Sequence, residues 1–257
     1  MVNIEIKPSD VPFVLLEFLK IVGKKNTKNN PISKKHRFYK LFKFYWENRD
    51  KKQITLPENL FESFNEVLSI VTLKITLPKG KPIRMFLDKN MIDSLCIEAV
   101  VVMEYLKRGY AVQWLSPIAK DPPDLRVTDK VGSFEVDFEV KFRNESPTTE
   151  GAFRLVAKGL KSLQGRKTKE NPAVIVVHNS ENLGWADWLE DPIVKEKLST
   201  LLGKKKYRII SGLIFLGGIE IRKDAYSKQI GIQLVGYRVD TATKPLPYSF
   251  LLKGSKI

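Results

Sequence analysis

The sequence predicts an α/β protein, in which helices flank a central mixed β-sheet and a helical N-terminal region precedes this core. Three observations predict it. The first eighty residues carry apolar side chains at helical spacing. The segment 134–143 alternates apolar and charged residues with the period of two that is typical of a strand. Between residues 91 and 178 the patterns follow in the order helix, strands, helix, strand, which favours a sheet with helices packed on it.

The N-terminal region is expected to be helical and to cover residues 1–80. A first helix is predicted from Pro12 to Val22, after the capping residues Ser9 and Asp10. A second is predicted at about Lys34 to Glu47, and a third starts near Pro57. Their inward-facing apolar residues recur at helical spacing: Phe38, Leu41, Phe42, Tyr45, Phe61, Phe64, Val67 and Leu68.

The run Pro78-Lys79-Gly80-Lys81-Pro82 marks a boundary, so the mixed α/β domain is expected to cover residues 81–257. Its helices are predicted at Met91 to Arg108, ended by Gly109, and at Ala152 to Leu163. Gly217-Gly218 is interpreted as a turn. Strands are predicted at Tyr110 to Leu115, Leu125 to Thr128, Phe134 to Phe142, Ala173 to His178, Tyr207 to Leu216, Ile219 to Arg222, Gln229 to Val239 and Tyr248 to Leu252.

The charge of the chain indicates a polyanionic partner. Lys and Arg number 44 against 29 Asp and Glu, which gives a net charge of +15. An excess of this size favours nucleic acid, although a solvated basic surface has the same composition. The single cysteine, Cys96, lies in an apolar run, so it excludes an internal disulfide and is expected in the core.

Membrane insertion is not expected. No apolar stretch has the length needed to cross a bilayer, and acids and a proline stand where a signal peptide would have an apolar run. The sequence therefore predicts a soluble protein of the cytoplasm.

The strands 125–128 and 134–142 carry the residues of greatest chemical interest. Glu139 and Lys141 share one face of the second strand, because strand side chains alternate. If the hairpin is symmetric about Val131 and Gly132, Asp124 falls opposite Glu139. Two carboxylates that close repel each other, and a divalent cation between them would remove the penalty. A solvated sheet face, with Lys141 in a salt bridge, would show the same alternation.

These residues match a family signature. Pro123-Asp124, fourteen intervening residues and then Glu139-Val140-Lys141 resemble the PD-(D/E)XK nuclease superfamily, which includes restriction enzymes and Holliday junction resolvases. That superfamily often has a metal-holding acid on its first core helix, before a Gly-aromatic pair and a strand. Glu98 occupies this place before Gly109-Tyr110, and Glu104 is the competing residue.

The resemblance continues downstream and covers residues 91–179, about a third of the chain. The superfamily places a helix with basic or amide side chains after the hairpin, and then a buried strand. On the matching helix Arg154, Lys158 and Lys161 form a stripe at helical spacing, and Gln164 follows it. These four residues are expected to contact nucleic acid.

What the resemblance implies is a restriction-endonuclease-like core that hydrolyses phosphodiester bonds in DNA with Mg²⁺ or Mn²⁺. Asp124 and Glu139 would hold the metal, with Glu98 bound directly or through water. Lys141 would position the attacking water or stabilise the transition state. Many members of the superfamily act as homodimers, so a homodimer is expected by analogy.

A second basic segment lies near the N-terminus. From Lys24 to Lys52 there are eleven basic residues against two acids, with aromatics between them. Lys34, Lys35 and Arg37 are therefore expected to contact nucleic acid, and a solvated helix face is nearly as well supported.

Three alternatives to a DNA nuclease stay open. The chain could be a non-catalytic nucleic-acid-binding module of the same fold, or a nuclease that acts on RNA or branched DNA. It could also be a basic architectural protein whose carboxylates are only surface charge.

Overall fold

The structure is a computed structural model of the 257-residue chain. Contacts between Cα atoms divide it into two compact units, residues 1–103 and 104–257. The predicted helix at 12–22 and the predicted boundary at 78–82 lie outside the residues that the structure describes. Those residues are 4–6, 34–48, 54–76, 83–86, 88–115, 123–129, 132–143, 149–164, 171–179, 185–222 and 228–251.

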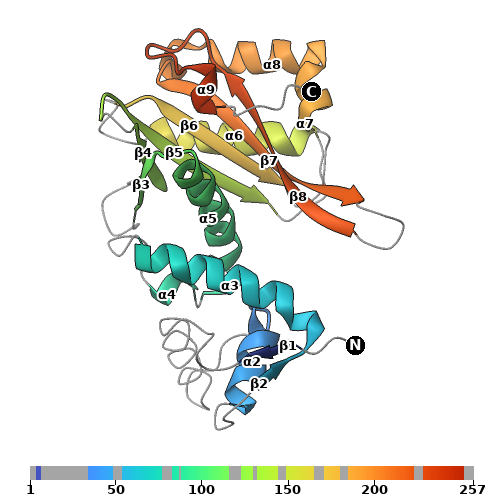
Figure 1. Ribbon diagram of the computed structural model, residues 1–257. Coiled ribbons are helices and arrows are strands. Elements are labelled where there is room, and N and C mark those ends of the chain that lie inside the picture. The colour runs from blue at the N-terminus through green and yellow to red at the C-terminus, as the bar shows by residue number, and fades with distance from the viewer. Residues whose placement is uncertain are drawn as a thin grey trace. The chain divides into compact units, whose positions relative to one another are not determined.

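The first unit contains helices and one small sheet (Figure 1). Strands β1 and β2 pair antiparallel, with Ile4 opposite Leu56; the sequence predicted only helices for this region. The third predicted helix runs on to Thr76. The elements of this unit are β1 (Ile4–Ile6), α2 (Tyr39–Glu47), β2 (Ile54–Leu56), α3 (Glu58–Thr76), α4 (Ile83–Phe86) and most of α5 (Ile92–Lys107).

Aromatic side chains pack α2 against α3, as the helical spacing predicts. Tyr45 stacks on Phe64 with the ring centroids 6.4 Å apart. Phe38 and Phe42 are almost fully buried and meet edge to face at 6.1 Å. Such pairs bury a large apolar area and fix the angle between the elements that carry them. The core of this unit is therefore built largely from one stripe of α2 and the facing side of α3.

The second unit is a six-stranded mixed sheet in the order β3-β4-β5-β6-β7-β8, flanked by helices. The α/β class and the mixed sheet are thus as predicted. Strand β4 pairs antiparallel with β3 and with β5. Strand β6 pairs parallel with β5 and with β7, and β8 returns antiparallel to β7. The strands are β3 (Ala111–Trp114), β4 (Leu125–Thr128), β5 (Glu135–Arg143), β6 (Ala173–Asn179), β7 (Ile210–Arg222) and β8 (Lys228–Arg238).

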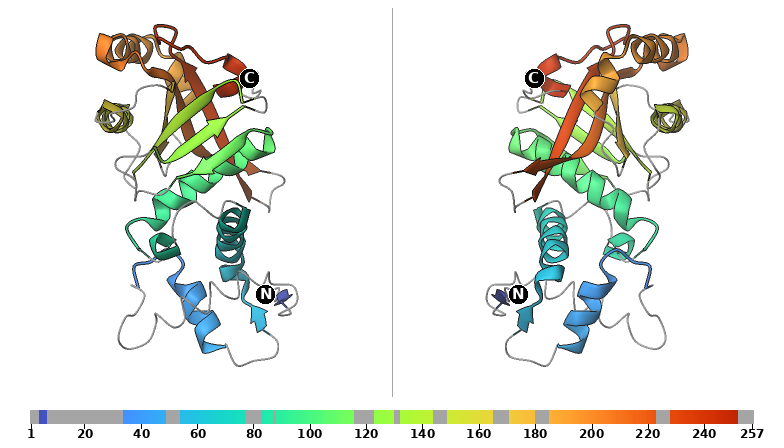
Figure 2. Two further views of the ribbon diagram at one scale, coloured as in Figure 1. Left: turned by 90° about the vertical axis from the view of Figure 1, so that its left-hand side faces the viewer. Right: turned by 90° about the vertical axis from the view of Figure 1, so that its right-hand side faces the viewer.

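Helices cover both faces of this sheet, and α6 and α9 lie on opposite sides of it (Figure 2). On one face, buried residues of α6, α7 and α8 form a single core with Ile175 of β6 and Phe215 of β7. On the other, Phe250 of α9 contacts Phe138 of β5 and Tyr105. The helical elements of this unit are α6 (Thr149–Gln164), α7 (Trp185–Glu190), α8 (Pro192–Leu202), the 3₁₀ turn η2 (Lys205–Tyr207) and α9 (Tyr248–Leu251).

Two glycines end elements where the sequence predicts it. Gly109 has φ 81° and follows α5, and the N–H of Tyr110 donates to the Tyr105 carbonyl at 3.0 Å, which is a Schellman arrangement. Gly132 has φ 71° in the β4–β5 turn, and its N–H donates to the Asp129 carbonyl at 3.0 Å. Only glycine adopts such a positive φ without steric cost.

Two predictions about the C-terminal region are wrong. Gly217-Gly218 is not a turn, because β7 continues through it and both glycines pair with β8, Gly217 with Gln233 and Gly218 with Ile232. The predicted strand from Tyr248 to Leu252 is the short helix α9 over its described residues. A short apolar run contains too few residues to distinguish the side-chain period of a strand from that of a helix. Pro247, just before this run, favours a helix start.

Helices α7 and α8 were not predicted. The signals for α8 are present: Asp191 caps it by accepting from the Ile193 N–H at 2.8 Å, and Pro192 follows the cap. Its buried residues, Val194, Leu198 and Leu202, recur every four positions. In the described part of the chain no helix is both long enough and apolar enough to cross a bilayer.

Candidate functional site

The β4–β5 hairpin has the predicted register. Leu125 pairs with Phe138 and Thr128 with Glu135, so the next position outward, Asp124, falls opposite Glu139. Asp124 is held there by three hydrogen bonds. Its N–H donates to the Phe138 carbonyl at 3.0 Å, its own carbonyl accepts from the Leu115 N–H at 3.1 Å, and its Oδ2 accepts from the Val140 N–H at 2.8 Å. The carboxylate of Asp124 is therefore bound to the backbone of the residue that follows Glu139.

Glu139 and Lys141 lie on the same face of β5 and form an ion pair. The ammonium of Lys141 donates to Oε1 of Glu139. Glu139 is 5% exposed, whereas 23% of the Lys141 side chain is exposed. A buried carboxylate is costly without a partner, so this contact offsets the burial of Glu139. The lysine end of the pair is the one that reaches solvent.

Helix α6 packs on the face of the sheet that bears these side chains. In the parallel pairing of β5 with β6, Glu139 is opposite Ile175 and Lys141 is opposite Val177, and paired residues point to the same face. Ile175 and Val177 belong to the core formed with α6. The helix comes close to Ile175, because a Cβ placed on Gly159 would lie 2.6 Å from the Ile175 Cγ2. This packing fixes β6, the strand that pairs with the strand of the candidate site.

The same face carries a second ion pair nearer the start of β5. Nε of Arg126 donates to Oδ1 of Asp137 at 2.8 Å, and Nη1 of Arg126 is 3.6 Å from Oε2 of Glu135. The hydrogen bond to Asp137 raises the pKa of Arg126. The sequence signal for this pair is the hairpin register, which sets Arg126 opposite Asp137.

Among the residues of the hairpin face whose side chains the structure describes, negative charges outnumber positive ones. Four carboxylates, on Asp124, Glu135, Asp137 and Glu139, stand against two cations, Arg126 and Lys141. This excess occurs in a chain with a net charge of +15. A bound cation would offset it.

Glu98, the third acid of the predicted site, lies in the first unit. It is 3% exposed, and its Oε1 accepts a hydrogen bond from Oγ of Ser94, one turn earlier in α5, at 3.4 Å. Glu98 is therefore a buried residue of α5. Glu104, its competitor, is only half-buried.

The predicted basic stripe lies on the outer side of α6. Arg154, Lys158 and Lys161 are exposed, while the opposite side of the helix is buried against the sheet. Arg154 pairs with Glu150 one turn earlier. The side chain of Gln164 lies outside the described part. The stripe thus forms a charged surface of α6.

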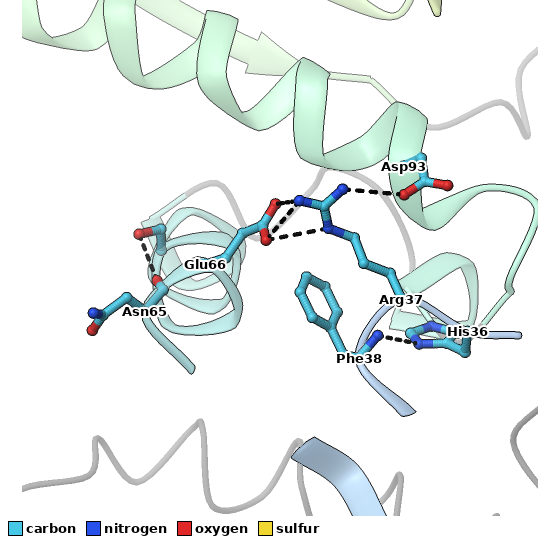
Figure 3. A network of polar contacts seen from close by, with 7 residues as sticks. His36, Arg37, Phe38, Asn65, Glu66 and Asp93 are labelled. Carbon is cyan, nitrogen blue, oxygen red and sulfur yellow. Dashed lines mark hydrogen bonds and ion pairs between the residues drawn. The ribbon is translucent and has the colours of Figure 1, made fainter. Parts of the chain in front are cut away.

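The predicted basic residues of the first unit have two different environments. Lys34 and Lys35 are exposed in the turn before α2. Arg37 instead lies between Glu66 of α3 and Asp93 of α5 (Figure 3). Its Nη2 is 3.0 Å from Oε1 of Glu66, and its Nη1 is 3.5 Å from Oδ1 of Asp93. Burial tends to lower the pKa of Arg37, but these acids outweigh it and raise the pKa. Arg37 therefore has a structural role in joining three elements.

Asp124 and Glu139 are the hairpin residues that could hold a divalent metal. Within the described residues there is no group of three or more His, Cys, Asp or Glu side chains that could hold a metal ion. Mg²⁺, however, is commonly held by one or two carboxylates together with water and substrate phosphate oxygens. Asp124 and Glu139 supply two hard oxygen donors of that kind.

Comparison of the chain with protein-family models, with curated proteins and with solved structures finds no match. Support for a function therefore comes from the hairpin geometry, from its charges and from the order of the elements around it.

Proposed function

We propose that this chain is a Mg²⁺-dependent nuclease that hydrolyses phosphodiester bonds in DNA, with a restriction-endonuclease-like core. The observation that carries the proposal is the hairpin register: it sets Asp124 opposite Glu139, with Lys141 bound to Glu139. The order α5, β3, β4, β5, α6, β6 is the order of helix, hairpin, helix and strand on which the resemblance rests, and it supports the proposal further.

In this proposal Asp124 and Glu139 hold the metal. When bound, a divalent ion lowers the pKa of a coordinated water and stabilises the charge that develops on the phosphate. Lys141 holds its ammonium beside Glu139 at the solvent side, where it orients a water or binds a phosphate oxygen. The Val140 N–H fixes the direction of the Asp124 carboxylate.

Cleavage assays test the proposal. Labelled single-stranded, double-stranded and branched DNA and RNA are incubated with the chain in Mg²⁺, in Mn²⁺ or in EDTA. Asp124→Asn and Glu139→Gln keep the shape of each side chain and remove its charge, so each is expected to lower the cleavage rate by on the order of 100-fold or more. Lys141→Met is expected to lower the rate comparably.

The matched control is Glu135→Gln, which removes a carboxylate from the same face of the same strand. Its cleavage rate should stay within about threefold of the unchanged chain, because a partly exposed charge outside the site is screened. Equal losses in all four variants, or cleavage that persists in EDTA, would contradict the proposed site.

The non-catalytic binding module is the second candidate, and one observation favours it. Lys141 already neutralises Glu139, so the pair is stable without a metal. Salt-sensitive binding of DNA without cleavage in Mg²⁺ or Mn²⁺ would select this candidate. Cleavage confined to RNA or branched DNA would retain the site and change the substrate.

A further inference from the structure

A second polar site lies at the opposite end of the parallel strands from Lys141. A hollow of about 270 Å³ opens where β6 and β7 begin. Three segments that are far apart in the chain form its walls: Asn171 and Pro172 before β6, Lys205, Lys206, Arg208 and Ile209 before β7, and Thr243 and Lys244 after β8. None of these residues belongs to the hairpin site described above.

The walls of this hollow are strongly basic. Lys205, Lys206, Arg208 and Lys244 all contribute to the lining, and all four are exposed. Among the described residues that line the hollow, none has a carboxylate; the nearest acid contact that the structure gives is from Asn171 Nδ2 to Glu135 Oε2 at 3.3 Å. Four cations around one concavity repel one another, and an anion inside it would relieve the repulsion.

Backbone hydrogen bonds hold the three segments in a fixed frame. The Thr243 N–H donates to the Arg208 carbonyl at 2.7 Å, and the Ala173 N–H donates to the Ile209 carbonyl at 3.0 Å. The fully buried hydroxyl of Ser211 donates to the Lys244 carbonyl at 2.6 Å. The cations are thus attached to an ordered frame, so little backbone entropy would be lost when an anion binds.

We propose that this basic hollow binds a backbone phosphate of nucleic acid, as a second contact beside the carboxylate site. The proposal deepens the proposed function and rests on it for the identity of the polymer. The Thr243 hydroxyl and the Asn171 amide add neutral donors to the four cations, which together match the donors used for phosphate oxygens.

The charge and the position of the hollow favour a polymer over a small phosphorylated molecule. Its eight described lining residues include four cations, whereas pockets for drug-sized ligands have only a few polar or charged groups. Asn171 precedes Ile175, the partner of Glu139, by four positions, which corresponds to about 13 Å of extended chain. Four base pairs of a duplex cover about that distance, so one nucleic acid is long enough to reach both sites.

Binding in EDTA tests this hollow separately from cleavage. Fluorescence anisotropy of a short labelled duplex is measured at salt concentrations between about 50 and 200 mM. Lys205→Gln/Arg208→Gln is expected to weaken binding on the order of 10- to 100-fold at about 100 mM salt, and to lower the slope of log K against log salt by about two. Circular dichroism and thermal unfolding confirm that the variant is folded.

The matched control removes the same charge from α8. Lys195→Gln/Lys197→Gln changes two exposed cations that do not line the hollow, so its affinity should stay within about threefold. Equal losses in the two double variants, or no loss in Lys205→Gln/Arg208→Gln, would overturn the proposal.

Calorimetric titration with inorganic phosphate and with a mononucleotide forms the second arm. Binding of either that disappears in Lys205→Gln/Arg208→Gln while duplex affinity is unchanged would assign the hollow to a small anion, and would also overturn it.

The outcomes for the two sites are distinguishable. Glu139→Gln should retain duplex binding in EDTA, because the hollow does not include it. A chain that cuts no substrate, but loses duplex affinity in Lys205→Gln/Arg208→Gln, would refute the proposed function and support the hollow. If the chain cuts DNA, and Lys205→Gln/Arg208→Gln leaves its cleavage rate and duplex affinity unchanged, the proposed function is supported and the hollow is refuted as a phosphate site.

Discussion

At the scale of single residues, the contact between Glu139 and Lys141 decides how the candidate site can be tested. Breaking a buried ion pair by removing one partner costs about 3–5 kcal/mol, because the other charge is left uncompensated. Lys141→Met can therefore lose activity through stability alone, since Glu139 is buried. Asp124→Asn is the cleaner variant, because the side-chain carbonyl of Asn still accepts from the Val140 N–H while the charge is gone.

His36 has a role in stability that depends on pH. Its Nδ1 accepts from the Phe38 N–H at 3.1 Å, so its Nε2 carries the proton of the neutral ring and donates to the Phe86 carbonyl at 2.9 Å. Protonation of Nδ1 would break the first of these bonds. Burial lowers the pKa of His36 below its ordinary 6.5, and the bond to Phe86 offsets only part of that effect.

Because the pKa of His36 is lower in the folded chain, the unfolded chain binds more protons between the two pKa values. The free energy of unfolding should therefore fall as the pH drops below 6.5, by at most about 1.4 kcal/mol per pH unit. Urea unfolding above and below pH 6.5 measures this loss, which should be absent in His36→Gln. His178, the other histidine, is the internal comparison in an NMR titration. A His36 pKa at or above 6.5 would contradict the assignment.

At the scale of elements, the packing of α6 on β6 depends on one glycine. A Cβ at Gly159 would lie 2.6 Å from the Ile175 Cγ2, and Ile175 is fully buried. Alanine is favoured over glycine in a helix by up to about 1 kcal/mol, but overpacking costs about 1–3 kcal/mol. We therefore expect Gly159→Ala to lower the free energy of unfolding, by up to about 2 kcal/mol.

Chemical denaturation of Gly159→Ala measures this cost, and Ser162→Ala is the control. Ser162 is an exposed residue of the same helix, so its substitution should change stability by less than about 0.5 kcal/mol. A stabilising Gly159→Ala would mean that helix propensity outweighs the close contact and that α6 can move away from Ile175.

The β4–β5 hairpin could be predicted from the sequence, for physical reasons. Alternation of charged and apolar residues sets which side chains of a strand share a face, and a glycine with positive φ at 132 fixes the turn and so the register. Asp124, Glu139 and Lys141 all follow from that register. Because α5 and α6 carry long stripes of apolar residues, both helices were also predicted to within three residues at each end.

Features that depend on contacts between distant segments could not be predicted. Gly217-Gly218 continues β7 because β8 pairs with it, and no local pattern records that pairing. The basic hollow is assembled from residues near 171, 205 and 243. The only part of the hollow that stands out in the sequence is a basic run, Lys204-Lys205-Lys206-Tyr207-Arg208. A basic run alone does not predict a binding site.

At the scale of the whole molecule, the net charge of +15 sets how the chain meets any polyanion. We expect sequence-independent binding of duplex DNA and of heparin at low salt, without a divalent metal. The affinity should fall by on the order of 10³-fold or more between about 50 and 200 mM salt if six or more phosphates are contacted. Anisotropy with unrelated DNA sequences measures this, and an affinity that does not change with salt would contradict it.

The position of β5 inside the sheet determines when the candidate site forms and when it is lost. This strand is third of six and is bonded to β4 on one side and to β6 on the other, so its amides exchange with solvent only when the surrounding strands separate. Asp124 is attached to the same strand through Val140. The arrangement of carboxylates and ammonium is therefore assembled and lost together with the sheet.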